Sequence, residues 1–255
     1  MQSSYRLAVD VGGTFTDFAL LDEESGEVHI AKSLTTPADP SVGVLMGVNA
    51  FNDVTADHIV ATRRIAHATT LVANAVIERK GALTALLTTK GFRDVLELRR
   101  HVRVTTYELW ADPPEPLVPR WLRLPINERV FSDGNVLKEV ESSDVAKVVP
   151  LLQAEGVTSV AISFLHSYAN ADNERKVSEL LQNLIPDVAV TCSHEVLPQI
   201  KEYERTSTTV VNAYVKPLTR TYLANLEKGL VEKGYSAPLN IMLSNGGLGS
   251  IATAA

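Results

Sequence analysis

The sequence of 255 residues contains a single cysteine, Cys192, so no disulfide can form within the chain. Because this residue lies in the apolar segment VAVTCSHEV, we expect a buried thiol that packs as a small hydrophobe, with a reactive thiol as the alternative. No apolar run approaches the roughly 20 residues that span a membrane, and the first residues lack the basic-then-apolar order of a signal peptide. These absences predict a cytoplasmic protein with no membrane partner.

The sequence also lacks a surplus of positive charge. Its 24 Lys and Arg residues are outnumbered by 30 Asp and Glu residues, which gives a formal net charge of −6. Nucleic-acid binders of this size usually carry a basic excess or stripe, so we expect no nucleic-acid partner. A hydrophobic content of 45% with 14 Gly and 12 Pro is that of an ordinary globular protein and excludes disordered and collagen-like classes.

The first hundred residues predict an α/β fold. Alternating apolar residues indicate strands at 5–11, 18–21 and 28–32, and the short turns between them favour an antiparallel meander. Helices and strands then alternate, at 40–52, 64–68, 69–80, 83–88 and 91–100. The order βββαβαβα predicts one mixed sheet with helices on its faces, as expected of a ribonuclease-H-like nucleotide-binding lobe.

A proline-rich segment at 110–127 interrupts this alternation, and we expect an extended segment or an insertion loop there. Trp110 and Trp121 flank it and are predicted to pin it to the body of the protein, with a binding surface as the alternative. Further helices and strands are predicted at 144–155, 159–165, 172–184, 188–192, 199–233 and 239–243. We expect Pro150 to kink the first of these helices and Pro217 to divide the long helical stretch.

The chemistry begins with the segment DVGGTFTD, which starts at Asp10. Gly12 and Gly13 allow backbone N–H groups to face one point without Cβ obstruction, which makes an anion-binding concavity. Thr14 and Thr16 can add hydroxyl donors. Asp10 would repel a phosphate unless a divalent cation stood between them, and Mg²⁺ binds through one or two carboxylates together with phosphate oxygens. We therefore predict a phosphate site at these residues, with Asp10 reaching Mg²⁺ through water; an ordinary β-turn is the alternative.

Other phosphate and catalytic motifs are missing. No Gly-Lys-Ser/Thr follows the glycines, so the turn is no Walker A loop. It leads into a strand rather than a helix, so it is no Rossmann fingerprint. The sequence has no His/Cys cluster with zinc spacing and no GxSxG nucleophile elbow.

Six segments in order make the chain resemble the hydantoinase A / 5-oxoprolinase family. They are DVGGTFTD at 10–17, HATTLVANAVIERKGA at 67–82, GFRDVLELRR at 91–100, SFLHSYANADNE at 163–174, SHEVLPQIKEYERTSTTVVNAYVKPL at 193–218 and MLSNGG at 242–247. The sequence departs from the family at Ala68, where glycine is usual, and at Leu243, where glutamine is usual. A side chain at position 68 narrows the backbone freedom of a turn, which allows a difference in substrate.

The resemblance implies a two-lobed, actin-like ATPase fold. Family members use ATP with Mg to phosphorylate the carbonyl oxygen of a cyclic amide, an enol or bicarbonate. The implied partners are a small cyclic amide or ketone substrate and a separate hydantoinase-B-like subunit, and a homo-oligomer is left open.

The resemblance also implies a division of the chain. Residues 1–185 would be the N-terminal ribonuclease-H-like region, with a Pro-rich insertion near 110–127, and residues 186–255 the truncated start of the hydantoinase A core. Because a second phosphate motif and a Gly-rich adenosine segment do not occur here, we expect the N-terminal part of a longer enzyme, inactive by itself. The alternatives are a non-catalytic nucleotide-binding fragment and a sugar- or acetate-kinase lobe, and the EYERTSTTVVNAY segment speaks against the kinase.

No catalytic residue is identified, but three are candidates. His67 lies between a strand and a predicted helix start, where an anion could bind, and a structural hydrogen bond is its alternative role. Arg93 and Glu97 lie in a segment of alternating charge. That segment either clamps a carbonyl or carboxylate group, as Arg does bidentately, or forms an exposed face of ion pairs.

Three further features have two interpretations each. Asn74 and Glu78 are four residues apart and share a helix face, either beside a ligand or in solvent. His166 ends a buried strand, where ligands often bind in α/β sheets, although a structural role is favoured. The hydroxyl run at 206–209 indicates either a packed polar seam or a wall that faces the substrate.

Overall fold

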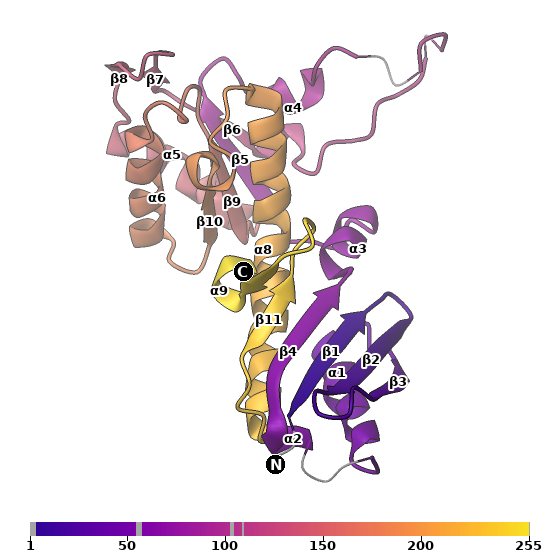
Figure 1. Cartoon of the computed structure of the whole chain (residues 1–255). Coiled ribbons are helices and arrows are strands. Elements are labelled where there is room, and N and C mark those ends of the chain that lie inside the picture. Colours follow the sequence, from indigo (N-terminus) through magenta and orange to yellow (C-terminus); the bar gives the residue numbers. More distant parts are fainter. Residues whose placement is uncertain (1–3, 55–57, 103–104, 109, 255) are drawn as a thin grey trace. The chain divides into compact units, whose positions relative to one another are not determined.

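The computed structural model describes residues 4–54, 58–102, 105–108 and 110–254, which form two compact units (Figure 1). The first unit contains the described residues up to Lys80 together with those from Leu218 onwards, and the second contains Gly81–Pro217. The division at residues 185 and 186 concerns family regions and stays a prediction. None of the helices in the described ranges combines the length and the apolar character needed to cross a bilayer.

The first unit opens with the predicted antiparallel meander. Strands β1 (Tyr5–Val11), β2 (Phe15–Asp22) and β3 (Val28–Leu34) pair in sequence. In β1, every second side chain is buried, as its alternating sequence predicts. The meander is confirmed.

The remaining strands of the first unit make its sheet a mixed one. Strand β4 (Thr62–Thr69) pairs parallel with β1, and β11 (Leu239–Met242) pairs parallel with β4. Strand β12 (Leu248–Ser250) closes the sheet in antiparallel orientation, which gives the order β12-β11-β4-β1-β2-β3. An α/β fold with a mixed sheet is therefore confirmed.

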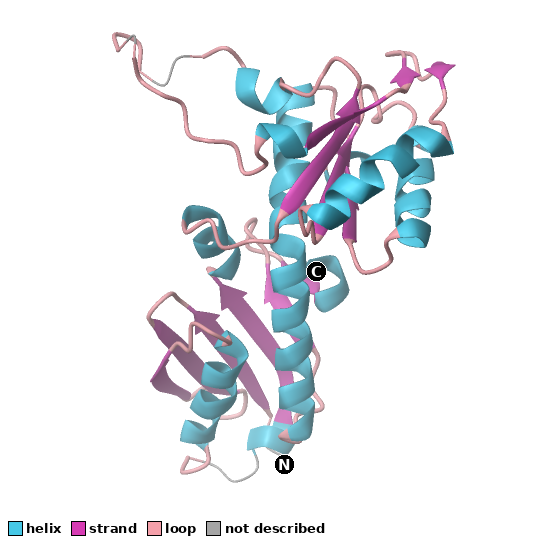
Figure 2. Cartoon of the chain, turned by 180° about the vertical axis from the view of Figure 1, so that it is seen from behind, coloured by secondary structure: helices cyan, strands magenta, loops and turns pink. Residues whose placement is uncertain are grey.

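One face of this sheet is covered by helix α1 (Pro40–Gly47) and by the last part of α8 (Glu202–Glu232), as Figure 2 shows. Leu7 and Val9 of β1 pack there against Leu223 and Leu226 of α8. The opposite face carries exposed or half-buried residues, among them Asp10. The shorter helices of this unit are η1 (Val48–Phe51), α2 (His58–Ala61), α3 (Leu71–Ile77) and α9 (Ile251–Ala254).

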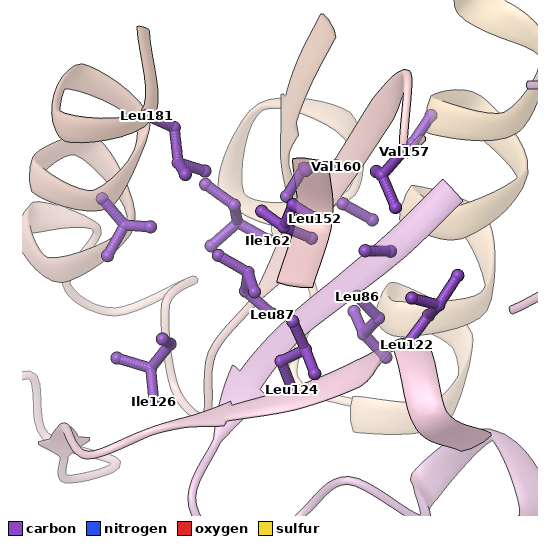
Figure 3. Packing of buried hydrophobic residues seen from close by; sticks show 14 of the residues in the cluster. Leu86, Leu87, Leu122, Leu124, Ile126, Leu152, Val157, Val160, Ile162 and Leu181 are labelled. Carbon is purple, nitrogen blue, oxygen red and sulfur yellow. The ribbon is translucent and has the colours of Figure 1, made fainter. Parts of the chain in front are cut away.

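The second unit contains a fully parallel sheet in the order β10-β9-β5-β6. Its strands are β5 (Thr84–Thr89), β6 (Arg123–Ile126), β9 (Ser159–Ser163) and β10 (Ala189–Cys192). Every residue of β5 and β9 is buried, as in central strands that are covered on both faces. The covering residues include Leu152 and Leu181 (Figure 3).

Helices α5 (Ser142–Ala154) and α6 (Asp172–Leu184) and the first part of α8 contribute to this core. Pro150 lies inside α5, and the kink expected there stays a prediction. The other elements of this unit are short: α4 (Val95–Leu98), η2 (Arg120–Leu122), β7 (Arg129–Val130), β8 (Val136–Lys138) and α7 (Ser193–Val196).

The prediction of one sheet within the first hundred residues was wrong, because β5 belongs to the other sheet. The edge of β4 that β5 would have used is taken by β11, a strand more than 150 positions later in the chain. Strand β5 instead pairs with β6 and β9, where both of its faces are buried. A local pattern of strands and helices cannot reveal such a distant partner.

The proline-rich segment differs from its prediction in two ways. It ends in the short helix η2 and the strand β6, and β6 accommodates Pro125 because it lies at the edge of its sheet. Trp110 is 90% exposed and Trp121 is 62% exposed, so neither side chain is anchored in a core. The expectation that they pin the segment was wrong.

Pro217 does not divide the long helix, because α8 runs through it without interruption. A proline inside a helix deprives the carbonyl four residues earlier of its N–H donor. In α8 that carbonyl belongs to Ala213, and it accepts a hydrogen bond of 2.7 Å from the Ser159 hydroxyl. The next carbonyl, of Tyr214, accepts 2.8 Å from the Ala82 N–H. The Ser159 hydroxyl at the start of β9 thus supplies the donor that the proline lacks.

This arrangement predicts a coupling between Ser159 and Pro217. Ser159→Ala should lower the free energy of unfolding by about 1–3 kcal/mol, since it leaves the buried Ala213 carbonyl without a donor. In a Pro217→Ala background the loss should be clearly smaller, because the restored N–H can bond to that carbonyl. Urea unfolding of the four proteins of this double-mutant cycle measures the coupling. Equal losses in both backgrounds would contradict the explanation.

Candidate functional site

The glycine turn closes the β1–β2 hairpin with Gly13 and Thr14 as its two loop residues. The N–H of Gly12 donates to the carbonyl of Phe15 at 3.0 Å. Neither glycine has φ in the left-handed region, so the need for glycine is one of space. A Cβ on Gly12 would lie 3.0 Å from the Phe15 carbonyl oxygen, and one on Gly13 would lie 3.4 Å from the amide nitrogen of Asn74.

The turn presents unpaired backbone donors. In the described part of the chain, the N–H groups of Gly13 and Thr14 donate to no other group. Gly13 and Thr14 are both exposed, so these N–H groups need no partner from the protein. Adjacent free N–H groups in a tight turn form a concavity that suits an anion, which is the chemistry that the sequence predicts for these residues.

A residue that sequence reasoning missed, Thr35, holds this turn from the other side. Its hydroxyl donates to the Gly12 carbonyl at 2.9 Å, and its N–H donates to the Thr14 carbonyl at 2.9 Å. It directly follows the last residue of β3, and the β2–β3 register places it beside Thr14. A hairpin register worked out from the sequence would have pointed to it.

Thr16 is placed differently from its predicted role. Its side chain is fully buried, and its hydroxyl oxygen lies 3.0 Å from that of Thr35. Since Thr35 uses its proton on the Gly12 carbonyl, Thr16 must be the donor in this pair. With its proton engaged there, Thr16 would have to rearrange before it could donate to a phosphate. A direct contact between Thr16 and a phosphate stays a prediction.

A pocket of about 310 Å³ lies beside the turn in the first unit. Gly12, Gly13 and Thr35 line one part of it, and the junction of β4 with α3 lines another. Asn74 and Glu78 both line this pocket, which favours the interpretation that they lie beside a ligand over the one that they face only solvent. The Asn74 amide donates to the Thr70 hydroxyl at 3.2 Å. The remaining lining residues are Val11, Pro37, Pro40, Thr69, Thr70, Leu71, Ala75, Lys80 and Leu218.

Asp10 lies on the uncovered sheet face, because successive residues of a strand point to opposite faces. It lines a second pocket of about 340 Å³ on that face, together with Ala68. Asp17 lies directly opposite on β2 and forms an ion pair of 2.9 Å with Lys32. Within the described ranges, the Asp10 carboxylate has no hydrogen bond or ion pair, so it is open to a hydrated cation.

The candidate His67 is turned toward the core of the first unit. Its side chain is 0% exposed, and its Nε2 lies 2.9 Å from the hydroxyl oxygen of Tyr222 in α8. Burial lowers the pKa of His67 to about 4, so the ring is neutral at pH 7. It does not line the pocket beside the turn, so its alternative, structural role fits the geometry and a catalytic role stays untested.

The candidates Arg93 and Glu97 belong to the second unit, where they form part of a polar network. Arg93 donates to the Arg120 carbonyl at 2.7 Å, and Glu97 pairs at 2.9 Å with the buried Arg123. Asp94 accepts two hydrogen bonds from Arg120, which holds the pKa of its carboxyl below the usual range. These contacts tie residues 93–97 to η2 and to the start of β6, which favours the interpretation of this segment as a set of ion pairs.

The hydroxyl run at 206–209 forms a packed polar seam at its two buried positions. Thr206 lies 2.9 Å from the Ser163 hydroxyl, and Thr209 donates to the Arg205 carbonyl at 2.6 Å.

His166 has φ of 60°, and its pKa is lowered by burial and by the nearby Arg205.

A cluster that the sequence did not reveal brings Glu174, Cys192 and His194 together, with ligand atoms within 4.8 Å of one another. The Glu174 carboxylate is already saturated by four donors: the N–H of Phe164, the hydroxyl of Ser193, and the N–H and Nδ1 of His194. Burial raises the pKa of Cys192 to about 12, so no thiolate is available near neutral pH. The cluster fits a structural role, and the prediction of a buried thiol is confirmed.

Comparison with known families identifies the chain. The sequence model of the hydantoinase/oxoprolinase N-terminal region matches residues 6–185, and that of hydantoinase/oxoprolinase matches residues 205–255. The chain belongs to the hydantoinase/oxoprolinase family.

Individual relatives match nearly the whole chain. It is 37% identical to caprolactamase subunit alpha of Pseudomonas jessenii, over 97% of this chain and 36% of that protein. It is 33% identical to the acetophenone carboxylase gamma subunit of Aromatoleum aromaticum, over 95% of this chain and 35% of that protein. The crystal structure of the ATP-dependent caprolactamase from P. jessenii matches with a TM-score of 0.85 at 37% identity, over 96% of this chain and 36% of that one. This chain spans about a third of the length of these relatives.

The buried His67 predicts a pH dependence of stability. Its pKa is about 4 in the folded protein and near 6.5 when unfolded, so the unfolded chain binds the proton more tightly between these values. His67 should therefore leave the free energy of unfolding unchanged above pH 6.5. Between pH 6.5 and pH 4 it should lower that free energy by about 3 kcal/mol. His67→Gln should flatten the fall between pH 7 and 5 in urea unfolding. Parallel pH profiles for the two proteins would contradict it.

Proposed function

We propose that this chain is the N-terminal lobe of an enzyme that uses ATP to activate a carbonyl group of its substrate. The observation that carries the proposal is the pair of unpaired N–H groups at Gly13 and Thr14, presented by a hairpin turn that follows the strand with the exposed carboxylate of Asp10. The similarity to the ATP-dependent caprolactamase supports the same assignment.

The turn fits the phosphates of ATP. Two free N–H donors match phosphate oxygens in charge and geometry, and the absence of a Cβ at Gly12 and Gly13 keeps the approach open. The exposed Thr14 would add a hydroxyl donor. The pocket beside the turn extends the site along apolar residues, including Val11 and Leu71.

Mg²⁺ fits at Asp10, since its carboxylate is exposed and has no partner among the described residues. Mg²⁺ keeps several waters and is usually held by one or two carboxylates and by phosphate oxygens. The ion would neutralise charge on the phosphates, which lets Asp10 stand near them without repulsion. Lys32 already neutralises the neighbouring Asp17, so Asp10 is the residue that we assign to the metal.

In the proposed reaction, the carbonyl oxygen of the substrate attacks the γ-phosphorus of ATP, the bond to the β-phosphate oxygen breaks, and ADP leaves. The carbonyl carbon then bears a phosphate leaving group and is open to attack. The residues of the turn would hold the phosphoryl oxygens as negative charge shifts during transfer. Arg93, Glu97 and His67 are retained only as candidates for contacts with the substrate.

The complete enzyme would have the two lobes of an actin-like ATPase, with this chain supplying one phosphate turn. The adenosine contacts and a second turn would then come from the remainder of the enzyme, so this chain by itself should bind ATP weakly and turn over nothing. We assign a cyclic amide or a ketone as the substrate. We also assign a hydantoinase-B-like subunit as partner, which agrees with relatives that are named as subunits.

The role of Asp10 can be tested by mutation in the full enzyme with its partner subunit. Asp10→Asn should lower the ATPase rate by about 10²–10³, because a charge contact that acts during phosphoryl transfer is lost. Asp53→Asn, which removes an exposed carboxylate from the same unit, is the matched control and should change the rate less than twofold. Circular dichroism confirms the fold of both variants. An Asp10→Asn rate within twofold of wild type would rule the role out.

A further inference from the structure

We propose that Thr35 is a positioning residue that sets the direction in which the glycine turn presents the unpaired Gly13 N–H to phosphate. The proposal rests on the function proposed above, since it concerns the same turn. Thr35 itself touches only the protein. It acts on the carbonyl side of the turn, through the two hydrogen bonds that it donates to Gly12 and Thr14.

The argument follows from the planarity of the peptide bond. In a trans peptide, the C=O of one residue and the N–H of the next lie in one plane and point in opposite directions. The Thr35 hydroxyl holds the Gly12 carbonyl at 2.9 Å, so it fixes the plane that contains the unpaired Gly13 N–H. The Thr35 N–H holds the Thr14 carbonyl at 2.9 Å, so it fixes the plane that contains the Phe15 N–H.

Glycine makes such a restraint necessary. Gly12 and Gly13 have the widest range of backbone conformations of any residue type, so a turn built from them does not hold its peptide planes by itself. A phosphate that had to order the turn would lose binding free energy to that ordering, whereas a turn fixed in advance would not. The same two hydrogen bonds also hold the Gly12 and Thr14 carbonyl oxygens in place. If these oxygens turned toward a phosphate, their partial negative charge would repel it.

Thr16 supports Thr35 in turn. Its buried hydroxyl donates to the Thr35 hydroxyl at 3.0 Å and so leaves the single proton of Thr35 for the Gly12 carbonyl. The result is a directed series from Thr16 to Thr35 to Gly12. This series gives Thr16, the second threonine of the GGTFT segment, a role in shaping the turn.

The test compares two substitutions at position 35 in the full protein. Thr35→Val keeps the shape but removes the hydroxyl, so the affinity for Mg-ATP measured by calorimetry should fall about tenfold. Thr35→Ser restores the hydroxyl and should bind within twofold of wild type. Thr84→Val is the matched control, because it removes a hydroxyl bond of the same kind, to the Ala82 carbonyl at 2.8 Å, in the second unit. It should leave the affinity unchanged.

A second measurement reports the turn without nucleotide. In protein labelled with ¹⁵N-glycine, the Gly13 amide should have an order parameter near 0.85 in the wild-type and Thr35→Ser proteins, and below about 0.6 in Thr35→Val. A valine variant that binds as tightly as wild type, or a serine variant as weak as valine, would overturn the inference and leave the proposed function standing. So would an unchanged order parameter in the valine variant. A wild-type full protein that binds no Mg-ATP would overturn the proposed function and this inference together.

Discussion

The first unit depends on strand β1 being paired along both of its edges. Its antiparallel partner β2 follows directly in the chain, and its parallel partner β4 arrives after a helix. Because β1 and β4 are parallel, their carboxyl ends lie side by side at the same end of the sheet. The start of α3, which follows β4, lies there too. This arrangement brings Asn74 beside the glycine turn, in the pocket that both line, whereas Asp10 points to the uncovered face of the sheet.

Local features of the sequence were sufficient to predict the parts of the fold that local forces determine. The meander follows from alternation in β1 and from turn residues, and the helices follow from their periodic apolar residues. The membership of β5 could not be predicted, since its choice of sheet depends on β11 occupying the edge of β4. The prediction at Pro217 failed for a related reason, because the donor that replaces its missing bond, Ser159, lies far away in sequence.

The candidate site was predictable to a similar extent. The paired glycines and Asp10 indicated an anion site directly, since their conformational freedom and charge are intrinsic to the residue types. The role of Thr35 could not be predicted from composition, because a threonine after a strand is unremarkable until the register places it beside Thr14. The burial of His67 and Thr16 was likewise hidden, since their partners Tyr222 and Thr35 come from other elements.

The discontinuity of the first unit has a consequence for the order in which the protein folds on the ribosome. The second unit is one continuous stretch, so all of its core partners have been synthesised once Pro217 has been added. The meander is made before the second unit, yet β4 must wait for β11 and for the last part of α8, which follow only after that unit. The strands of the meander therefore remain without much of their core while the second unit is synthesised, and chaperones have an opportunity to bind there.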